Sequence, residues 1–188
     1  KPVIVVGGGA KYSGAREELI RFSETYGIPL VETQAGKSTV EYSFPHNLGG
    51  LGVTGTLAAN KAAREADLII GVGTRYTDFA TSSKTAFDPE NTRFVNINVS
   101  RMQAYKLDAV TVVADAKQAI QRLQTRLTGY ESQWGGQIAA FRQEWATERQ
   151  RLATISFKRE GFDPEIKGHF TQDLLNEYAD ALGTELAQ

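Results

Sequence analysis

Five short apolar runs recur along the chain and predict the strands of a buried sheet. The first, Val3 to Val6, is entirely β-branched and leads directly into three glycines, as a buried parallel strand does where it ends at a turn. The other four runs are similarly short and lie at residues 30–32, 67–73, 93–98 and 110–114.

Amphipathic helices are predicted between these runs. Ala15, Leu19, Phe22 and Tyr26 fall on one helical face, and Ser13 is expected to cap that helix. Two further helices are expected, at residues 57–65 and, capped by an aspartate, at 115–127. Because strands alternate with helices, we predict an α/β fold. It is a doubly wound, mostly parallel sheet of five or six strands with helices on both faces.

The C-terminal part of the chain departs from this alternation. Trp134, Ile138, Phe141 and Trp145 recur at helical spacing, which predicts an amphipathic helix packed on the α/β domain. The residues that follow are polar, as in a linker, and precede a last short helix. The predicted organisation is therefore an α/β domain at 1–130, a packed helix at 131–153, and a linker with a helix at 154–188.

Composition excludes several classes of function. The 21 basic and 22 acidic side chains are interspersed, so nucleic acid is not an expected partner. The absence of cysteine excludes disulfides and thiolate sites, and two histidines are too few for a histidine-rich metal site. No apolar run approaches the roughly 20 residues that cross a bilayer, so we expect a cytoplasmic protein without a membrane partner. The chain begins at Lys1 and has its single methionine at Met102, so we expect a piece of a larger protein.

The first glycine turn is a candidate ligand site, because ligands of open parallel sheets bind beyond the carboxyl ends of the strands. Gly7, Gly8 and Gly9 resemble part of a dinucleotide fingerprint, although Tyr12 occupies the place of its third glycine. A tight turn without a ligand explains the glycines equally well. Glu32 ends the next strand, where it is either a ribose-binding carboxylate or a solvated strand terminus.

A second glycine cluster, Gly49 to Gly55, leads into the helix predicted at 57–65. A helix start favours a phosphate or carboxylate, and Thr54 or Thr56 is able to add a hydrogen bond. The alternative is a loop that needs glycine to pass under a neighbouring segment.

Arg75 and Asp78 follow another strand end, where they form either a binding site or an ordinary surface ion pair. The sequence holds no phosphate loop, no nucleophile elbow and no histidine near a candidate serine. We therefore predict no catalytic residue and no metal ligand in this chain.

Several motifs in a fixed order resemble one enzyme family. They are Gly7-Gly8-Gly9, Ile28-Pro29, Gly52-Val53-Thr54-Gly55, Ala66-Asp67-Leu68-Ile69-Ile70 and Gly73-Thr74-Arg75-Tyr76-Thr77-Asp78. Over residues 1–128 they resemble the Rossmann-like central domain of thiamine-diphosphate-dependent enzymes, the superfamily of acetohydroxyacid synthase and pyruvate oxidase. Three stretches, 32–38, 47–55 and 74–79, are most similar to the hydrolases that open a cyclic 1,2-diketone in myo-inositol catabolism. That group is also labelled malonic semialdehyde oxidative decarboxylase.

This resemblance implies a parent enzyme that cleaves a C–C bond of a cyclic 1,2-diketone with water. Thiamine diphosphate and magnesium would be bound by a pyrimidine-binding and a diphosphate-binding domain outside this chain, which alone would be inactive. The parent would be a homodimer or homotetramer. The alternatives are a nucleotide- or FAD-binding central domain of a synthase or decarboxylase and, less favoured, a nicotinamide enzyme of deacetylase-like topology, whose catalytic histidine and zinc module are absent.

The resemblance also implies roles for particular residues. The positions matching cofactor-contacting regions of the family, whether for FAD or an adenine nucleotide, are Gly7, Gly8, Gly9, Gly52, Thr54, Gly55 and Arg75. The flavin branch differs at Val53-Thr54 and at Asp78-Phe79, which argues against flavin. Gln34, Lys37 and Ser38 are expected near the active site of the parent enzyme.

Overall fold

The computed structural model describes residues 1–154. The chain divides into two compact units, Lys1–Glu144 and Trp145–Gln188, and the first contains the whole sheet. The linker and last helix predicted within 154–188 lie outside the described residues, apart from Thr154 itself.

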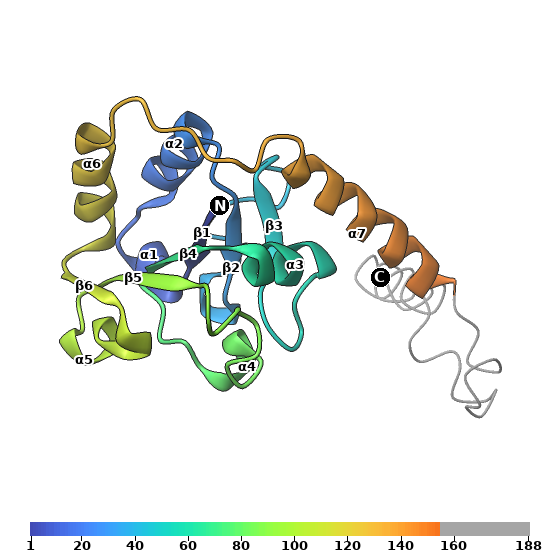
Figure 1. The fold of residues 1–188 in the computed structure, drawn as a ribbon, viewed down its shortest axis with the longest axis horizontal. Helices are drawn as coiled ribbons and strands as arrows, with labels where there is room; N and C mark the ends of the chain where they lie inside the picture. Colours follow the sequence, from blue (N-terminus) through green and yellow to red (C-terminus); the bar gives the residue numbers. More distant parts are fainter. Residues whose placement is uncertain (155–188) are drawn as a thin grey trace, which may run out of the picture. The chain divides into compact units, whose positions relative to one another are not determined.

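Six parallel strands form one sheet in the order β3-β2-β1-β4-β5-β6 (Figure 1). Their bounds are β1 Pro2–Val6, β2 Leu30–Glu32, β3 Asn47–Gly50, β4 Leu68–Val72, β5 Arg93–Asn98 and β6 Val110–Val113. The prediction of a parallel sheet of five or six strands is confirmed. The strand order reverses between β1 and β4, and such a switch point is where doubly wound folds bind ligands.

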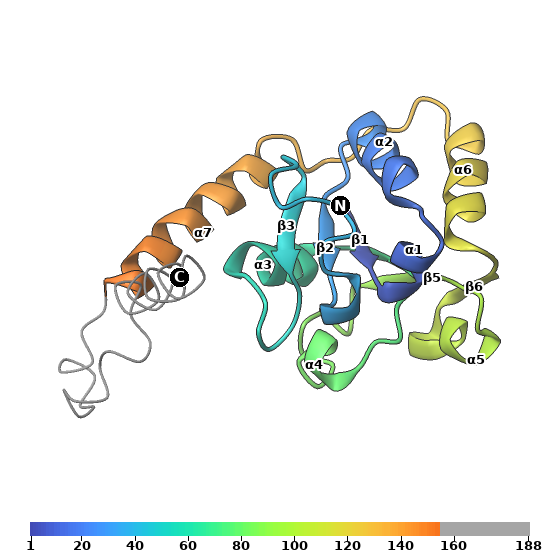
Figure 2. The same cartoon turned by 180° about the vertical axis from the view of Figure 1, so that it is seen from behind.

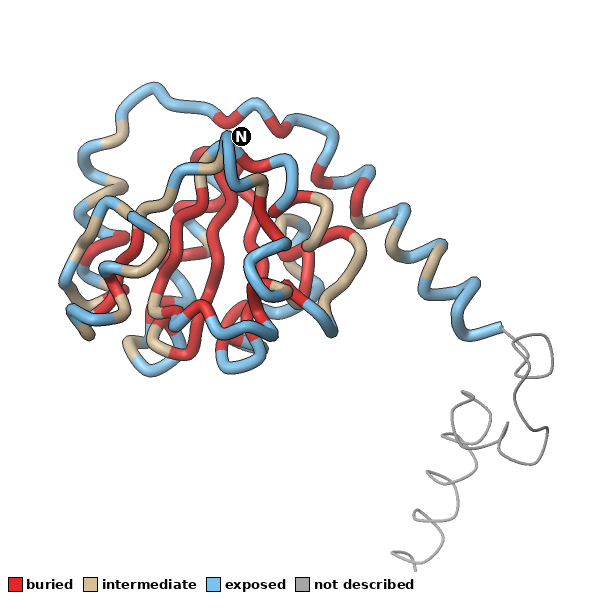
Figure 3. Tube along the Cα trace, turned by 60° about the horizontal axis from the view of Figure 1, so that its bottom comes forward, coloured by how far each residue is buried: buried red, intermediate tan, exposed pale blue. Residues whose placement is uncertain are grey.

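Helices cover both faces of the sheet. The α-helices are α1 Gly8–Tyr12, α2 Arg16–Tyr26, α3 Leu57–Glu65, α4 Asp78–Thr81, α5 Arg101–Ala104, α6 Ala116–Arg126 and α7 Gln137–Ala153, with 3₁₀ turns η1 Gln34–Gly36 and η2 Lys106–Asp108. Ile4 and Val6 pack in one core with α2 and α6, which lie side by side in Figures 1 and 2. Val3 and Val5 point to the opposite face and are equally buried, as Figure 3 shows for the strands as a group.

The first helical segment differs from the prediction. The glycines do not precede one long helix: the chain turns from β1 at Gly7, the N-cap, and the short helix α1 already begins at Gly8. Gly14, at φ +65°, then breaks the helix, and α2 begins after Ala15 without a side-chain cap. The cap predicted at Ser13 is therefore wrong. Its hydroxyl oxygen instead accepts a hydrogen bond at 2.9 Å from the Lys117 amide, at the start of α6.

The apolar face predicted for that helix is confirmed, since its four members are buried. The predicted cap of the later helix is also confirmed: Asp115 accepts a hydrogen bond at 3.0 Å from the Gln118 amide. The edge strand β3 was not predicted. It is short and contains two glycines, Gly49 and Gly50, so it lacks the apolar pattern that identifies the other strands.

The helix predicted over 131–153 begins only at Gln137. Gly135 and Gly136 precede it, and Gly135 has a φ of +48°, which ordinary residues rarely adopt. Trp134 therefore lies before the helix, where its indole nitrogen donates a hydrogen bond at 2.6 Å to the Pro2 carbonyl. Ile138 is buried, so the start of α7 packs on the domain as expected.

Candidate functional site

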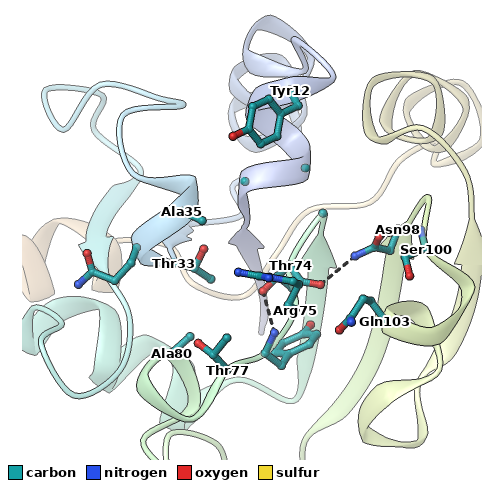
Figure 4. Close-up of a pocket in the computed structure, with 15 residues that line it drawn as sticks. Tyr12, Thr33, Ala35, Thr74, Arg75, Thr77, Ala80, Asn98, Ser100 and Gln103 are labelled. Atoms are coloured by element: carbon teal, nitrogen blue, oxygen red, sulfur yellow. Dashed lines mark hydrogen bonds between the residues drawn. The ribbon is translucent and has the colours of Figure 1, made fainter.

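A cavity of about 500 Å³ lies at the carboxyl ends of the central strands. It is lined by residues that follow β1 (Gly8, Gly9, Tyr12), β2 (Thr33–Ala35), β4 (Gly73–Thr77, Ala80) and β5 (Asn98, Ser100, Gln103). We call it the switch-point cavity. Figure 4 shows the Arg75 side chain across the middle of this group, between Tyr12 and Thr77.

The cavity gathers some of the predicted site residues and leaves others outside. Gly8, Gly9, Gln34 and Arg75 line it. The lining does not include Gly7, Gly52, Thr54, Gly55, Lys37 or Ser38. The side chain of Gln34 nevertheless connects the two groups, because its Nε2 donates a hydrogen bond at 2.6 Å to the Thr54 hydroxyl.

The first glycine turn packs against the end of β4. The Gly7 amide donates to the Val72 carbonyl at 2.8 Å, and the Gly9 amide donates to the Gly73 carbonyl at 2.9 Å. A Cβ on Gly7 would overlap the Gly73 carbonyl oxygen. Two of the amides that a diphosphate would need are therefore already hydrogen-bonded within the protein. Glycine is required here because the backbones at two neighbouring strand ends lie in direct contact.

The second glycine cluster is closed in a similar way. Gly52 has a φ of +100°, and a Cβ there would overlap the Phe79 carbonyl oxygen. The Asn60 side chain accepts from the Gly52 amide at 2.9 Å and donates to its carbonyl at 3.0 Å. The Gly55 amide donates to the Gly52 carbonyl at 2.9 Å. Of the two interpretations of this cluster, the loop that passes under a neighbouring segment is the one that these contacts support.

The two threonines of this cluster are also engaged. Thr56 caps α3 by accepting a hydrogen bond at 3.0 Å from the Ala59 amide, and its hydroxyl donates to the Leu48 carbonyl at 2.5 Å. Thr54 accepts from Gln34. Thr56 therefore has no proton left to donate to an anion at this helix start, whereas the Thr54 hydroxyl, which only accepts here, keeps its own proton.

Glu32 is neither a cavity residue nor a solvated terminus. Its side chain is buried, and Oε1 accepts a hydrogen bond at 3.5 Å from the Val40 amide. Burial raises the pKa of this carboxyl above 4.5, against the hydrogen bond from Val40 and the charge of Lys37. Both sequence interpretations of Glu32 are wrong, because the loop between β2 and β3 folds over it.

Hydrogen bonds hold the backbone at Arg75 in place. Its carbonyl accepts a hydrogen bond at 2.7 Å from the Lys106 ammonium group, and the neighbouring Thr74 carbonyl accepts one at 2.9 Å from the Asn98 amide group (Figure 4). Tyr76, at φ +49°, donates its amide to the Thr74 hydroxyl at 3.2 Å. Among the described residues no ion pair joins Arg75 to Asp78, so the predicted surface pair is not formed.

Three polar lining residues were missed by sequence reasoning. Asn98 ends β5, and Ser100 and Gln103 begin the segment after it. Only their position in the sequence could have identified them, because residues that follow a parallel strand reach the same edge as the glycine turns.

Burial also raises the pKa of Tyr76, whose hydroxyl donates to the Asn96 side chain at 2.8 Å, so this phenol is a structural hydrogen-bond donor.

Within residues 1–154, no group of three histidine, cysteine, aspartate or glutamate side chains is placed to hold a metal ion. The helices of the same residues are all too short or too polar to cross a membrane.

Residues 1–123 match a family model described as the central domain of thiamine pyrophosphate enzymes. The chain belongs to this family. Its Rossmann-like strand order and switch-point cavity agree with that membership. The resemblance inferred from the motifs is confirmed.

Three similar proteins carry the same name. The chain is 72% identical over 188 residues to a protein of Bacillus velezensis, 71% identical over 188 residues to one of Bacillus subtilis, and 65% identical over 187 residues to one of Listeria monocytogenes. Each is named 3D-(3,5/4)-trihydroxycyclohexane-1,2-dione hydrolase. The comparisons cover all of this chain but only 30%, 30% and 29% of those proteins.

The described residues do not fit the diphosphate of thiamine diphosphate. That group is bound in proteins through a divalent cation with oxygen ligands, and no acidic cluster for a cation is present in residues 1–154. The amides of Gly7 and Gly9, which would cradle a phosphate, are bonded to β4 and the residue after it. We therefore derive no chemical step through this cofactor from residues 1–154.

Proposed function

We propose that this chain is the central domain of an enzyme that hydrolyses a C–C bond of a cyclic 1,2-diketone in inositol catabolism, and that the chain itself is not catalytic. One observation carries the proposal: 63–72% identity to proteins of that name runs through the whole chain, including residues 124–188, beyond the family match. A central domain from another branch of the family would be expected to be similar only over the residues that match the family model.

The reaction has a defined balance. The bond between the two neighbouring carbonyl carbons breaks, water gives a hydroxyl to one carbon, and a proton goes to the other. The products of ring opening are therefore a carboxylate at one end of the chain and an aldehyde at the other. A ring that carries three hydroxyls, as in the relatives' name, yields a hydroxylated monocarboxylate.

The remaining expectations complete this proposal. Thiamine diphosphate and magnesium are assigned to pyrimidine-binding and diphosphate-binding domains of the longer polypeptide, which is a cytoplasmic homodimer or homotetramer. Support comes from the family membership and from the lack of a metal-binding cluster in the described residues. The engaged glycine amides favour this proposal over a central domain that binds FAD or an adenine nucleotide.

The test compares the longer polypeptide with the 188-residue chain. Each is supplied with thiamine diphosphate, magnesium and the trihydroxycyclohexanedione, and formation of the open-chain acid is followed. We expect ring opening by the longer polypeptide and no activity above a buffer blank by the chain alone.

Activity of the chain alone, freed of host enzyme, would show that the non-catalytic assignment is wrong. A longer polypeptide that preferred pyruvate or malonic semialdehyde would contradict the substrate while leaving the central-domain assignment intact.

A further inference from the structure

The switch-point cavity has no role in the function proposed above, although about 500 Å³ is within the usual size of ligand pockets, roughly 300–1,000 Å³. In sheets of this order the expected occupant is a dinucleotide, held by amides of the first glycine turn. Here the Gly7 and Gly9 amides bond to β4 and the residue after it. Glu32, the residue positioned to bind a ribose, is buried outside the lining. The cavity therefore lacks two features on which dinucleotide binding depends.

The charge in the cavity comes from one residue. Arg75 is the only lysine, arginine, aspartate or glutamate among the lining residues. A guanidinium binds a carboxylate through two parallel hydrogen bonds, so a single arginine suits a ligand with one carboxylate. The bonds from Lys106 and Asn98 fix the backbone on both sides of the Arg75 α-carbon, which reduces the ordering that binding would require.

The remaining polar lining is neutral. Thr77, Ser100 and Gln103 supply two hydroxyls and an amide around Arg75. Gln103 Oε1 is buried and has no hydrogen-bond partner in the described part of the chain. A buried acceptor without a donor is unfavourable, and a ligand hydroxyl would supply that donor once the Gln103 side chain turns towards the cavity.

We propose that the switch-point cavity binds a small polyhydroxylated monocarboxylate, with its carboxylate on Arg75 and a hydroxyl donating to Gln103. The open-chain product described above belongs to this class, and the identification of the ligand with that product rests on the proposed function. The binding itself rests only on the lining of the cavity.

The probe is D-glucuronate, which combines one carboxylate with several hydroxyls. It is titrated into the 188-residue chain by calorimetry, and the amide resonances of Gly8 and Arg75 are followed by NMR. Acetate tests the charge without hydroxyls, myo-inositol tests hydroxyls without charge, and ADP and FAD test the nucleotide alternative. We expect saturable binding of D-glucuronate, with at least tenfold weaker binding of each of the other four compounds.

Variants locate the binding. Arg75→Gln is expected to weaken D-glucuronate binding at least tenfold, and Gln103→Leu several-fold. Arg93→Gln is the matched control, since Arg93 begins β5 at the opposite edge of the sheet, and it should bind like the parent chain. Circular dichroism of each variant verifies the fold.

Three results would overturn the proposal. They are no saturable binding up to about 10 mM, which is weaker than about −3 kcal/mol, equal loss in Arg75→Gln and Arg93→Gln, or tighter binding of ADP or FAD with shifts at Gly8. Because no turnover is measured, failure of the diketone assay leaves this test unaffected. D-glucuronate binding combined with a parent that does not hydrolyse the diketone would overturn only the link to the product.

Discussion

The turn at Gly7–Gly9 and the turn at Gly49–Gly55 both lead from a strand of the sheet towards a helix, and both use glycine to bring backbone against backbone. They differ in what lies beyond them. The first turn lies at the switch point, where β1 and β4 are paired and the strand order reverses, and it borders the cavity. The second adjoins the edge strand β3, and its loop is covered by the Phe79 carbonyl and by Asn60.

Glycine clusters in this fold indicate close backbone contacts, with or without a cavity beside them. In both turns the glycines mark close approach of two chain segments, which is a packing requirement. Whether a cavity forms depends on the neighbouring strand ends. Side chains that follow β4 and β5 surround the first turn, whereas the second lies against its own helix and the segment at Phe79.

The largest expected effect is at Gly52. Gly52→Ala should lower the free energy of unfolding by about 3 kcal/mol or more, because the new Cβ meets the Phe79 carbonyl and the backbone has φ +100°. Urea denaturation measures it. Gly14→Ala is the control, since Gly14 also has positive φ but has open space around it, and should cost about 1 kcal/mol. Equal costs would mean that packing does not explain the second turn.

Asn60 tests how the second turn is closed. Asn60→Ala removes both hydrogen bonds to Gly52 and should cost about 1–3 kcal/mol in thermal or urea unfolding, without changing ligand binding in the cavity. Asn91→Ala, at an exposed asparagine, should cost less than about 0.5 kcal/mol. A loss of D-glucuronate binding in Asn60→Ala would show that the two turns are coupled and do not act independently.

The Lys106 variant tests whether the backbone at Arg75, beside the first turn, is preorganised for ligand binding. Lys106→Met removes the bond to the Arg75 carbonyl and should weaken D-glucuronate binding about threefold by calorimetry, with a stability change below about 0.5 kcal/mol. Lys37→Met removes an exposed charge outside the cavity lining and should leave the affinity unchanged. If the two variants lost affinity equally, general charge rather than the positioning of Arg75 would be responsible.

The smallest effect concerns Glu32, which lies between the two turns and pairs with Gly50. Because burial raises its pKa above 4.5, its ionisation opposes folding. Its contribution to stability is present below about pH 4.5 and is lost as the pH rises through the folded-state pKa. Relative to Glu32→Gln, the parent chain should therefore become less stable between pH 4 and pH 7, as measured by urea midpoints. A pH-independent difference would contradict the burial of a titrating carboxyl at this position.

The predictable part of the fold came from repeated local patterns. Val3 to Val6 and residues 93–98 were identified as strands, and α3 was predicted with its observed bounds, because apolar periodicity reports burial directly. Ser13 failed as a cap because Gly14 divides the helix, an effect of backbone conformation that capping rules do not include. The strand β3 was not predicted, because its pairing with β2, rather than an apolar pattern in its residues, makes it a strand.

The candidate site was predicted less completely. Arg75, Gly8 and Gly9 were found from strand ends and a family resemblance, and they line the cavity. Gln103 was not found, because it lies in a short helix whose sequence carries no ligand-binding pattern. Gly52 and Gly55 were included because glycine before a helix fits an anion site as well as a tight crossing, and only the position of Phe79 distinguishes the two.

By itself the sequence determined the class of fold, the family and the absence of thiolate chemistry, because apolar periodicity, motif order and composition are properties of the chain alone. The tertiary structure alone decided which backbone amides are free and which side chains share a cavity. Those properties depend on contacts between distant segments, such as Gly7 with Gly73 and Lys106 with Arg75. A glycine or an arginine has the same local pattern whether its neighbour in space is a ligand or another strand.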